Sequence, residues 1–121
     1  MFNDNDNEML IEAAESGNLL EVKYALERGA DVNFWYNYPL RWASENGHLE
    51  VVKCLVENGA DVHACGDTPL CVAAENGHLD VVRYLVENGA NVHACENGAL
   101  RWAEKNDHLD VAEYLKSFGV N

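Results

Sequence analysis

Two histidine and cysteine pairs are the residues of this chain that most directly suggest metal chemistry. His63 and Cys65 stand two positions apart, and His93 and Cys95 repeat that spacing 30 residues later. Two histidines with two cysteines form a ligand set that zinc accepts. Structural zinc sites, however, usually take ligands from tight C-x2–4-C knuckles, whereas these pairs lie far apart in sequence. Copying of one repeat accounts for their recurrence, so we predict no metal site.

The chain shows none of the residue patterns that support catalysis or cofactor binding. It has no nucleophile beside a local base, no glycine-rich phosphate loop and no pair of carboxylates in an expected cleft. Asn-Gly pairs such as Asn46-Gly47 are typical of helix ends, because glycine readily adopts the left-handed conformation. We therefore predict no catalytic residue, no cofactor and no enzymatic activity.

The segment that holds the first histidine and cysteine pair recurs, and this self-similarity predicts the architecture. Residues 45–65 read ENGHLEVVKCLVENGADVHAC, and residues 75–95 read ENGHLDVVRYLVENGANVHAC. Blocks 38–67 and 68–97 agree at 20 of 30 positions, while 8–37 and 98–121 are weaker copies. Repeats of this length stack on their neighbours, because one unit cannot bury its own apolar face. We expect one domain over residues 1–121.

Composition limits the classes of partner and compartment. The 121 residues are 48% hydrophobic, which is enough for a continuous core in one domain. Eight Lys and Arg against 21 Asp and Glu give a formal charge of -13, which repels nucleic-acid phosphates and anionic membrane surfaces. The N-terminus has no leader pattern, and no apolar run is long enough to span a bilayer. We expect an intracellular, cytoplasmic protein.

The four cysteines are predicted to be free thiols. Cys54 occupies a column that holds tyrosine in the other copies, and Cys71 occupies a column that holds arginine in two. The repeat therefore requires neither thiol. Facing elements of adjacent repeats lie about 8 to 10 Å apart, whereas a disulfide requires Cα atoms within about 6.8 Å.

Block 68–97 shows how one repeat forms two helices. Thr68 can cap the first helix, and Pro69 suits its first turn, where the missing N–H would have no partner. Gly77 ends this helix. Apolar residues from 79 to 86 recur at helical spacing and predict a second helix, which Gly89 closes. Residues 90–97 contain too few apolar residues for a third helix, so we predict an extended finger that leads to the next block.

These motifs resemble the ankyrin repeat, with its T-P-L-H-x-A start, G-H-L-E-x-V middle and G-A-D-V-N end. The matching segments are Thr68-Pro69-Leu70, Gly47-His48-Leu49-Glu50, Gly77-His78-Leu79-Asp80, Gly29-Ala30-Asp31-Val32-Asn33 and Gly59-Ala60-Asp61-Val62. The resemblance covers residues 8–121. It implies an all-α ankyrin-repeat solenoid of stacked helix-turn-helix units with short extended fingers.

Two features depart from the family pattern. The period is 30 and not the usual 33, and the missing residues fall between Ala64 and Thr68, which predicts short fingers. Arg41, Cys71 and Arg101 replace the histidine of the start motif. The 30-residue period with its N-G-H-L-E-V-V-K core is similar to the ankyrin repeats of giant DNA viruses of amoebae.

The outer blocks are adapted to end a stack. Glu21 stands where the later copies carry valine, and Lys116 stands where the interior copies carry valine. Terminal repeats need polar outer faces for solubility. We expect residues 8–37 to form an N-terminal cap, 38–67 and 68–97 to form interior repeats, and 98–121 to form a C-terminal cap.

The most unusual segment is Phe34-Trp35-Tyr36-Asn37-Tyr38, here called the aromatic finger. Single rings could cover the groove between the first two repeats, but a short finger cannot bury all four. Exposed aromatic clusters are enriched at binding hot spots, so we predict an aromatic recognition patch.

Two further columns are assigned to packing. Trp42 and Trp102 share a column with Val72 and are expected in the core. His48, His78 and His108 begin the second helices and are expected to pack and form hydrogen bonds.

The resemblance implies that a partner protein contacts the fingers and the concave side of the first helices. The matching positions are Trp35, Tyr36, Asn37, Glu45, Asn46, Asp67, Glu75, Asn76, Glu96, Asn97, Lys105 and Asn106. Beside them we predict Phe34, Tyr38 and Arg41 as binding residues. Any one of them could instead belong to a solvated face. Arg41 could pair with Glu45 one helical turn away or reach the aromatic finger.

Two functional hypotheses follow from these observations. The first is a monomeric, non-enzymatic interaction module that binds a partner protein with a basic or mixed basic-apolar surface. The alternative is a small structural scaffold that self-associates through the aromatic finger. Neither nucleic acid nor a membrane is an expected partner.

Overall fold

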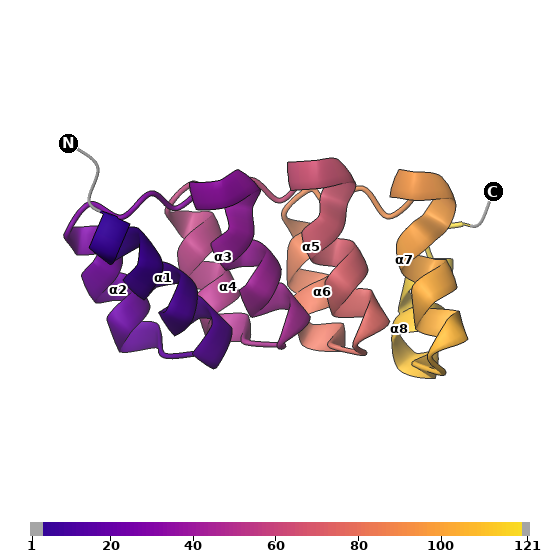
Figure 1. The fold of residues 1–121 in the computed structure, drawn as a ribbon. Helices are drawn as coiled ribbons and strands as arrows, with labels where there is room; N and C mark the ends of the chain where they lie inside the picture. The colour runs from indigo at the N-terminus through magenta and orange to yellow at the C-terminus, as the bar shows by residue number, and fades with distance from the viewer. Residues whose placement is uncertain (1–3, 120–121) are drawn as a thin grey trace.

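The computed structural model describes residues 4–119, which form eight helices and no strand (Figure 1). The helices are α1 (Asp4–Ser16), α2 (Leu19–Glu27), α3 (Phe34–Glu45), α4 (Leu49–Glu57), α5 (Ala64–Glu75), α6 (Leu79–Glu87), α7 (Ala94–Lys105) and α8 (Leu109–Lys116). Residues 1–3 and 120–121, which complete the expected domain and its last repeat, lie outside the described residues. The predicted all-α class is confirmed.

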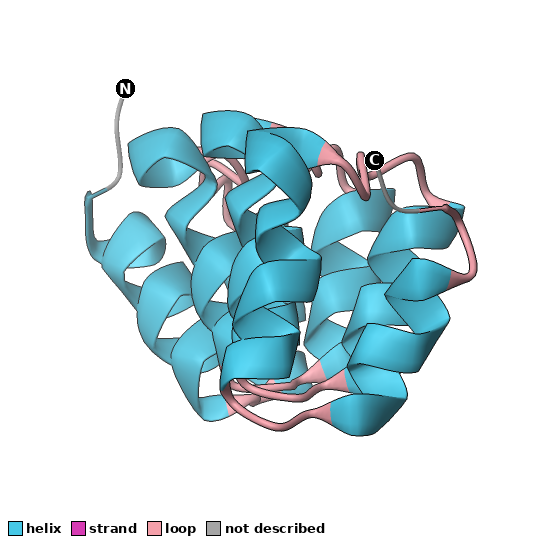
Figure 2. Cartoon of the chain, turned by 90° about the vertical axis from the view of Figure 1, so that its right-hand side faces the viewer, coloured by secondary structure: helices cyan, strands magenta, loops and turns pink. Residues whose placement is uncertain are grey.

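The helices stand as four pairs in a row. In Figure 1, α1, α3, α5 and α7 form the front layer, and their partners α2, α4, α6 and α8 lie behind. Figure 2 shows, from the side, that the loops gather at the two ends of the helices. Neighbouring front helices contact each other more extensively than neighbouring back helices do. The row therefore curves, with the front layer on its concave side.

One continuous apolar core lies between the two layers. Leu40 and Leu70 face it from the front helices, and Leu55 and Leu85 face it from the back helices, all with at most 1% of their surface exposed. Burial of such a side chain contributes about 1.5 to 3 kcal/mol. In α6 the buried residues recur at helical spacing, while Glu87 on the opposite side is exposed. The stripe of apolar residues predicted for the second helix of the repeat is confirmed.

A glycine in each turn of the first three helix pairs, namely Gly17, Gly47 and Gly77, allows the next repeat to approach. Gly47 has a φ of +73°, and a Cβ atom placed on it would lie 2.5 to 2.8 Å from the ring of His78. The Nε2–H of His78 donates to the carbonyl of Glu45 at 2.9 Å, and His48 bonds to the carbonyl of Glu15 at the same distance. For these two histidines the prediction of packing and hydrogen bonding is confirmed.

The prediction of extended fingers is wrong. Near the start of α3, α5 and α7, three residues form a turn of left-handed helix that leads directly into the right-handed part of the helix. In α3 this turn holds Trp35, Tyr36 and Asn37, with φ values of +50°, +55° and +65°. Residues 65–67 of α5 and 95–97 of α7 repeat it. Thr68 also differs from prediction, because its hydroxyl donates to the carbonyl of Cys65 at 2.6 Å and does not accept from the helix.

The next repeat holds the left-handed turns of α3 and α5 in place. Such a conformation costs about 1 to 2 kcal/mol per residue outside glycine. The side-chain oxygen of Asn37 accepts a hydrogen bond from the Asp61 N–H at 2.9 Å, and Asp67 accepts from the Asn91 N–H at 3.0 Å. Asn7 accepts from the Asp31 N–H at 2.8 Å, so this column of residues extends into α1, ahead of the predicted start of the first repeat at residue 8.

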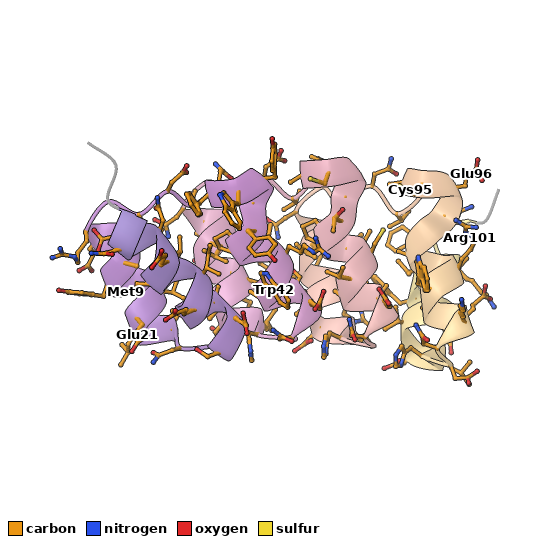
Figure 3. The ribbon with its side chains drawn as sticks, in the orientation of Figure 1. Met9, Glu21, Trp42, Cys95, Glu96 and Arg101 are labelled. Carbon is orange, nitrogen blue, oxygen red and sulfur yellow. The ribbon has the colours of Figure 1, made fainter. Side chains whose placement is uncertain are left out.

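The two outer ends of the row carry polar residues. Glu21 of α2, labelled in Figure 3, and Lys116 of α8 are both exposed. Lys116 forms an ion pair with Glu104 of α7 at 3.1 Å. These positions fit the expected polar outer faces, and the assignment of the end repeats as caps stays a prediction.

Candidate functional site

A row of four aromatic rings runs from the aromatic finger along α3. Phe34 stacks on Trp35 with ring centroids 5.6 Å apart. Trp35 meets Tyr38 edge-to-face at 5.8 Å, and Tyr38 meets Trp42 edge-to-face at 5.5 Å. Stacked and edge-to-face pairs each contribute about 0.5 to 1.5 kcal/mol beyond burial. The rings therefore hold one another in position on a surface that faces solvent.

The left-handed turn decides which side chains of the aromatic finger are exposed. Trp35 and Tyr36 are exposed over 64% and 86% of their surface, whereas Phe34 and Tyr38 are half-buried. The expectation that this short segment cannot bury all four rings is confirmed. Asn37 points inward, where its bond to Asp61 fixes the turn. The two most exposed rings are thus carried on a backbone that hydrogen bonds hold in place.

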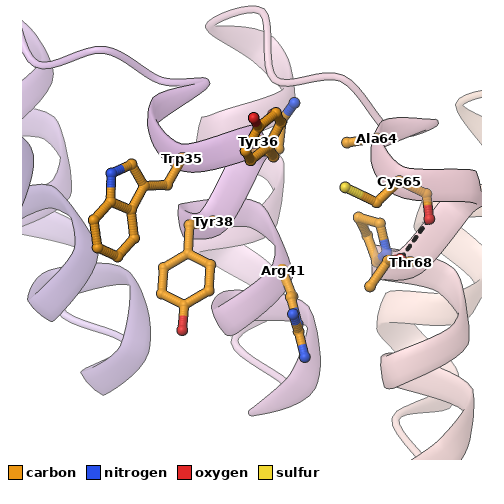
Figure 4. A pocket seen from close by; sticks show the side chains of 9 residues that line it. Trp35, Tyr36, Tyr38, Arg41, Ala64, Cys65 and Thr68 are labelled. Atoms are coloured by element: carbon orange, nitrogen blue, oxygen red, sulfur yellow. Dashed lines mark hydrogen bonds between the residues drawn. The ribbon is translucent and has the colours of Figure 1, made fainter.

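A cavity of about 340 Å³ lies between the start of α3 and the start of α5 (Figure 4). It is lined by Trp35, Tyr36, Asn37, Tyr38, Arg41, Ala64, Cys65, Thr68 and Pro69. Its cause is a mismatch in size between adjacent repeats. Tyr36 and Trp35 of α3 occupy the same repeat positions as Gly66 and Cys65 of α5, so large rings stand opposite small side chains.

Arg41 lies at this cavity and not in the predicted pair with Glu45. Figure 4 shows its side chain in the space between α3 and α5. Within residues 4–119 its guanidinium makes no hydrogen bond or ion pair. Arg101, at the same position of α7, donates instead to the carbonyl of Cys95 at 3.4 Å. Arg41 therefore lines the same cavity as residues of the aromatic finger, and direct contact with the rings stays a prediction.

The remaining predicted site residues fall into separate groups along the front of the row. Asn46 and Asn76 end α3 and α5, where their amides donate to the carbonyls of Glu15 and Val72 at 3.2 and 2.8 Å. Glu45 and Glu75 are half-buried beside them. Glu96, Asn97, Lys105 and Asn106 belong to the last pair of helices, and Figure 3 shows Cys95 and Glu96 at the start of α7 with Arg101 beside them. The structure therefore gathers only the α3 residues and their α5 neighbours into one site.

Asn37 and Asp67 are interior residues, although both were predicted to contact a partner. Each is 6% exposed. The side-chain oxygen of each accepts a hydrogen bond from a backbone N–H of the next finger, at Asp61 and Asn91 respectively. Asp67 also bonds to His63 Nδ1 at 2.9 Å. Short polar residues in the middle of a finger looked solvated in the sequence, because their partners lie 24 residues away.

Trp42 and Trp102, which share one repeat column, are less buried than predicted. Trp102 is 41% exposed, and Lys105 lies over its ring at 4.9 Å, so the prediction of core packing is wrong for Trp102. Trp42 is half-buried at the end of the row of rings (Figure 3). Val72 in the same column is buried, because a valine is short enough to remain under its neighbours.

Sequence reasoning missed the far wall of the cavity. Ala64, Cys65, Thr68 and Pro69 were not among the predicted contact residues, yet they line the space opposite Tyr36. The available signal was the alternation of large and small residues in one repeat column. This alternation predicts a cavity only when the left-handed turn is known, because the turn determines which repeat positions face each other.

The two histidine and cysteine pairs with the spacing of metal ligands make other contacts. His63 bonds to Asp67, and His93 Nδ1 bonds to the side-chain oxygen of Asn97 at 2.7 Å. In the described part of the chain, no three side chains of the metal-ligating types are grouped as ligands. All four cysteines are free thiols. Burial raises the pKa of the Cys71 thiol to about 11, so this thiol is not an activated nucleophile at neutral pH.

A row of stacked helix pairs, with exposed rings and a groove on its concave side, defines a helical-repeat protein. A family model described as ankyrin repeats in three copies matches residues 1–64 and 63–121, so the chain belongs to the ankyrin repeat family. No curated protein matches the chain. Ankyrin repeats are generally protein–protein interaction modules and are typically non-enzymatic. Among the described helices, none is both long and apolar enough to cross a membrane.

Proposed function

We propose that this protein binds a segment of a partner protein along the concave side of the row, with Trp35 and Tyr36 as its anchors. The observation that carries the proposal is the exposure of these two large rings beside an apolar cavity. Tryptophan and tyrosine dominate binding hot spots, because they bury much area with little rotamer freedom to lose. When a partner covers solvent-facing rings of this size, the burial of their apolar surface stabilises the complex.

The fixed geometry of the aromatic finger supports this role. Ring contacts link Trp35 to Phe34 and Tyr38, and the hydrogen bond between Asn37 and the Asp61 N–H fixes the turn that carries them. A surface that is ordered before binding loses less conformational entropy when the partner arrives. The same left-handed turn recurs in α5 and α7, so it belongs to the repeat, and in α3 it presents Trp35 and Tyr36 outward.

Net charge determines which partners approach readily. A formal charge of -13 attracts basic segments over a distance and repels acidic ones. We therefore propose a partner with a basic or mixed basic-apolar surface. The association rate is expected to fall by about tenfold or more as salt rises from low to high ionic strength, while the dissociation rate changes little. Interferometry over a salt series measures both rates, and an association rate that is independent of salt would contradict charge steering.

The anchor assignment is tested with the double variant Trp35→Ala and Tyr36→Ala. Partner proteins are first captured with the wild-type chain and identified by mass spectrometry, and their affinities are then measured by titration calorimetry. Loss of two hot-spot rings should weaken binding by about 30-fold or more. Tyr24→Ala is the control, because Tyr24 is 51% exposed on α2 in the back layer. An unchanged affinity in the double variant, or an equal loss in the control, would show that the aromatic finger is not the anchor.

Self-association through the same two rings is the competing proposal. Sedimentation velocity between a few and several hundred micromolar protein separates the two. We expect a single monomeric species at all concentrations. A dimer that appears with concentration and disappears in the double variant would favour the scaffold.

A further inference from the structure

The cavity between α3 and α5 combines apolar walls with a positive charge that has no partner. Trp35, Tyr36 and Tyr38 line one side, and Ala64 and Pro69 contribute to the other. A volume of about 340 Å³ is near the lower end of the range of ligand pockets and is large enough for one bulky side chain. Arg41 also lines this space, so an apolar group bound there would lie beside a guanidinium.

Several other cations of the described residues are already engaged within the chain. Arg28 pairs with Asp6 at 2.9 Å, and Lys116 pairs with Glu104 at 3.1 Å. Arg83 lies over the Tyr114 ring at 4.6 Å. Arg101 donates a hydrogen bond to the carbonyl of Cys95. Arg41 makes no such contact inside residues 4–119, and all five N–H donors of its guanidinium remain available to a ligand.

From this arrangement we propose that the cavity selects a partner segment in which a bulky apolar side chain is followed or preceded closely by a carboxylate. The apolar side chain fills the space beneath Tyr36, and the carboxylate pairs with the Arg41 guanidinium. This inference rests on the proposed function and specifies the chemistry of the bound segment. The planar guanidinium fork matches both oxygens of a carboxylate, and the apolar walls strengthen the pair by excluding water.

Because the whole protein is acidic, the pair between Arg41 and the partner's carboxylate also influences the register in which the segment binds. Across a surface with a net charge of -13, a carboxylate of the partner is repelled at most positions. Arg41 is the local exception beside the cavity. A largely basic segment with one carboxylate near its apolar residue would therefore favour the register that pairs this carboxylate with Arg41, because the other registers lose that pair beside the apolar cavity.

Small probes test the cavity without knowledge of the partner. The probes are 3-phenylpropionate, its neutral amide 3-phenylpropanamide and the cation phenethylamine, titrated into isotope-labelled protein. Binding is followed through the backbone amide NMR signals of residues 34–41 and 64–69. We expect the carboxylate to bind about five- to tenfold more tightly than the amide, and the amine to bind least of all. Net charge alone predicts the reverse order, with the cation preferred.

Two arginine variants with the same change in net charge give the decisive comparison. Arg41→Gln should abolish the preference for the carboxylate over the amide and leave the affinity for the amide within about twofold. Arg101→Gln, at the same repeat position of α7, should retain the wild-type preference. The proposal fails if the wild-type protein does not prefer the carboxylate, if both variants lose the preference equally, or if no probe shifts these signals. None of these outcomes affects capture of a partner by Trp35 and Tyr36, so the two proposals fail separately.

Discussion

Replacement of Leu85 by alanine should lower the free energy of unfolding by about 2 to 5 kcal/mol. The Leu85 side chain has no exposed surface, and it lies in α6, which contacts α4, α5 and α8. Removal of three of its carbon atoms costs their transfer free energy and leaves a cavity that the neighbouring helices fill only in part. In a stack where each interface joins neighbours, this one change weakens the contacts of the third repeat on both sides. Urea titration followed by circular dichroism measures the loss.

The matched control is Lys116→Ala on the last helix. Lys116 is exposed, and its pair with Glu104 involves two side chains that are each about half exposed. Exposed pairs contribute at most about 1 kcal/mol, and other surface changes usually stay within about 0.5 kcal/mol. We expect Lys116→Ala to fall within about 0.5 kcal/mol of the wild-type stability. If both variants lost stability equally, the last repeat would not be a C-terminal cap, and the prediction of a complete four-repeat domain would fail.

Sequence patterns predicted the features that depend on local periodicity. The period of 30 and the apolar spacing of residues 79–86 specify stacked helix pairs, because either feature can be recognised without knowledge of distant contacts. The histidine column was also predictable, since a histidine recurs next to a glycine at Gly47-His48 and Gly77-His78. That the ring of each histidine packs on the glycine of the preceding repeat emerged only from the structure.

The fingers were mispredicted because their conformation is set from outside the segment. Local preference disfavours Trp35 and Tyr36 in the left-handed region, so an extended path was the reasonable expectation. The bond from the Asp61 N–H to Asn37 belongs to the next finger, 24 residues away. The same cause explains the missed cavity. Its walls face each other only when the left-handed turn of α3 places Tyr36 opposite the small residues of α5.

Replacement of Gly47 by alanine should cost about 2 to 5 kcal/mol, although Gly47 is in a turn near the surface. The left-handed backbone, with a φ of +73°, contributes about 1 to 2 kcal/mol of this cost for any residue with a Cβ. The new methyl group would also lie within 2.8 Å of several ring atoms of His78. Since the Nε2–H of His78 bonds to the Glu45 carbonyl at 2.9 Å, the ring can move away only by losing that bond.

A double-mutant cycle separates the two contributions to the cost of Gly47→Ala. In a His78→Ala background the ring is absent, so Gly47→Ala should cost only the backbone strain of about 1 to 2 kcal/mol. The coupling free energy between the two positions should then be about 1 to 3 kcal/mol, measured by urea titration of all four proteins. Equal costs in both backgrounds would mean that backbone strain alone requires glycine, and that the close approach of His78 does not constrain the turn. A clear coupling would show that the interface between adjacent repeats, and not the turn itself, requires a glycine at this position.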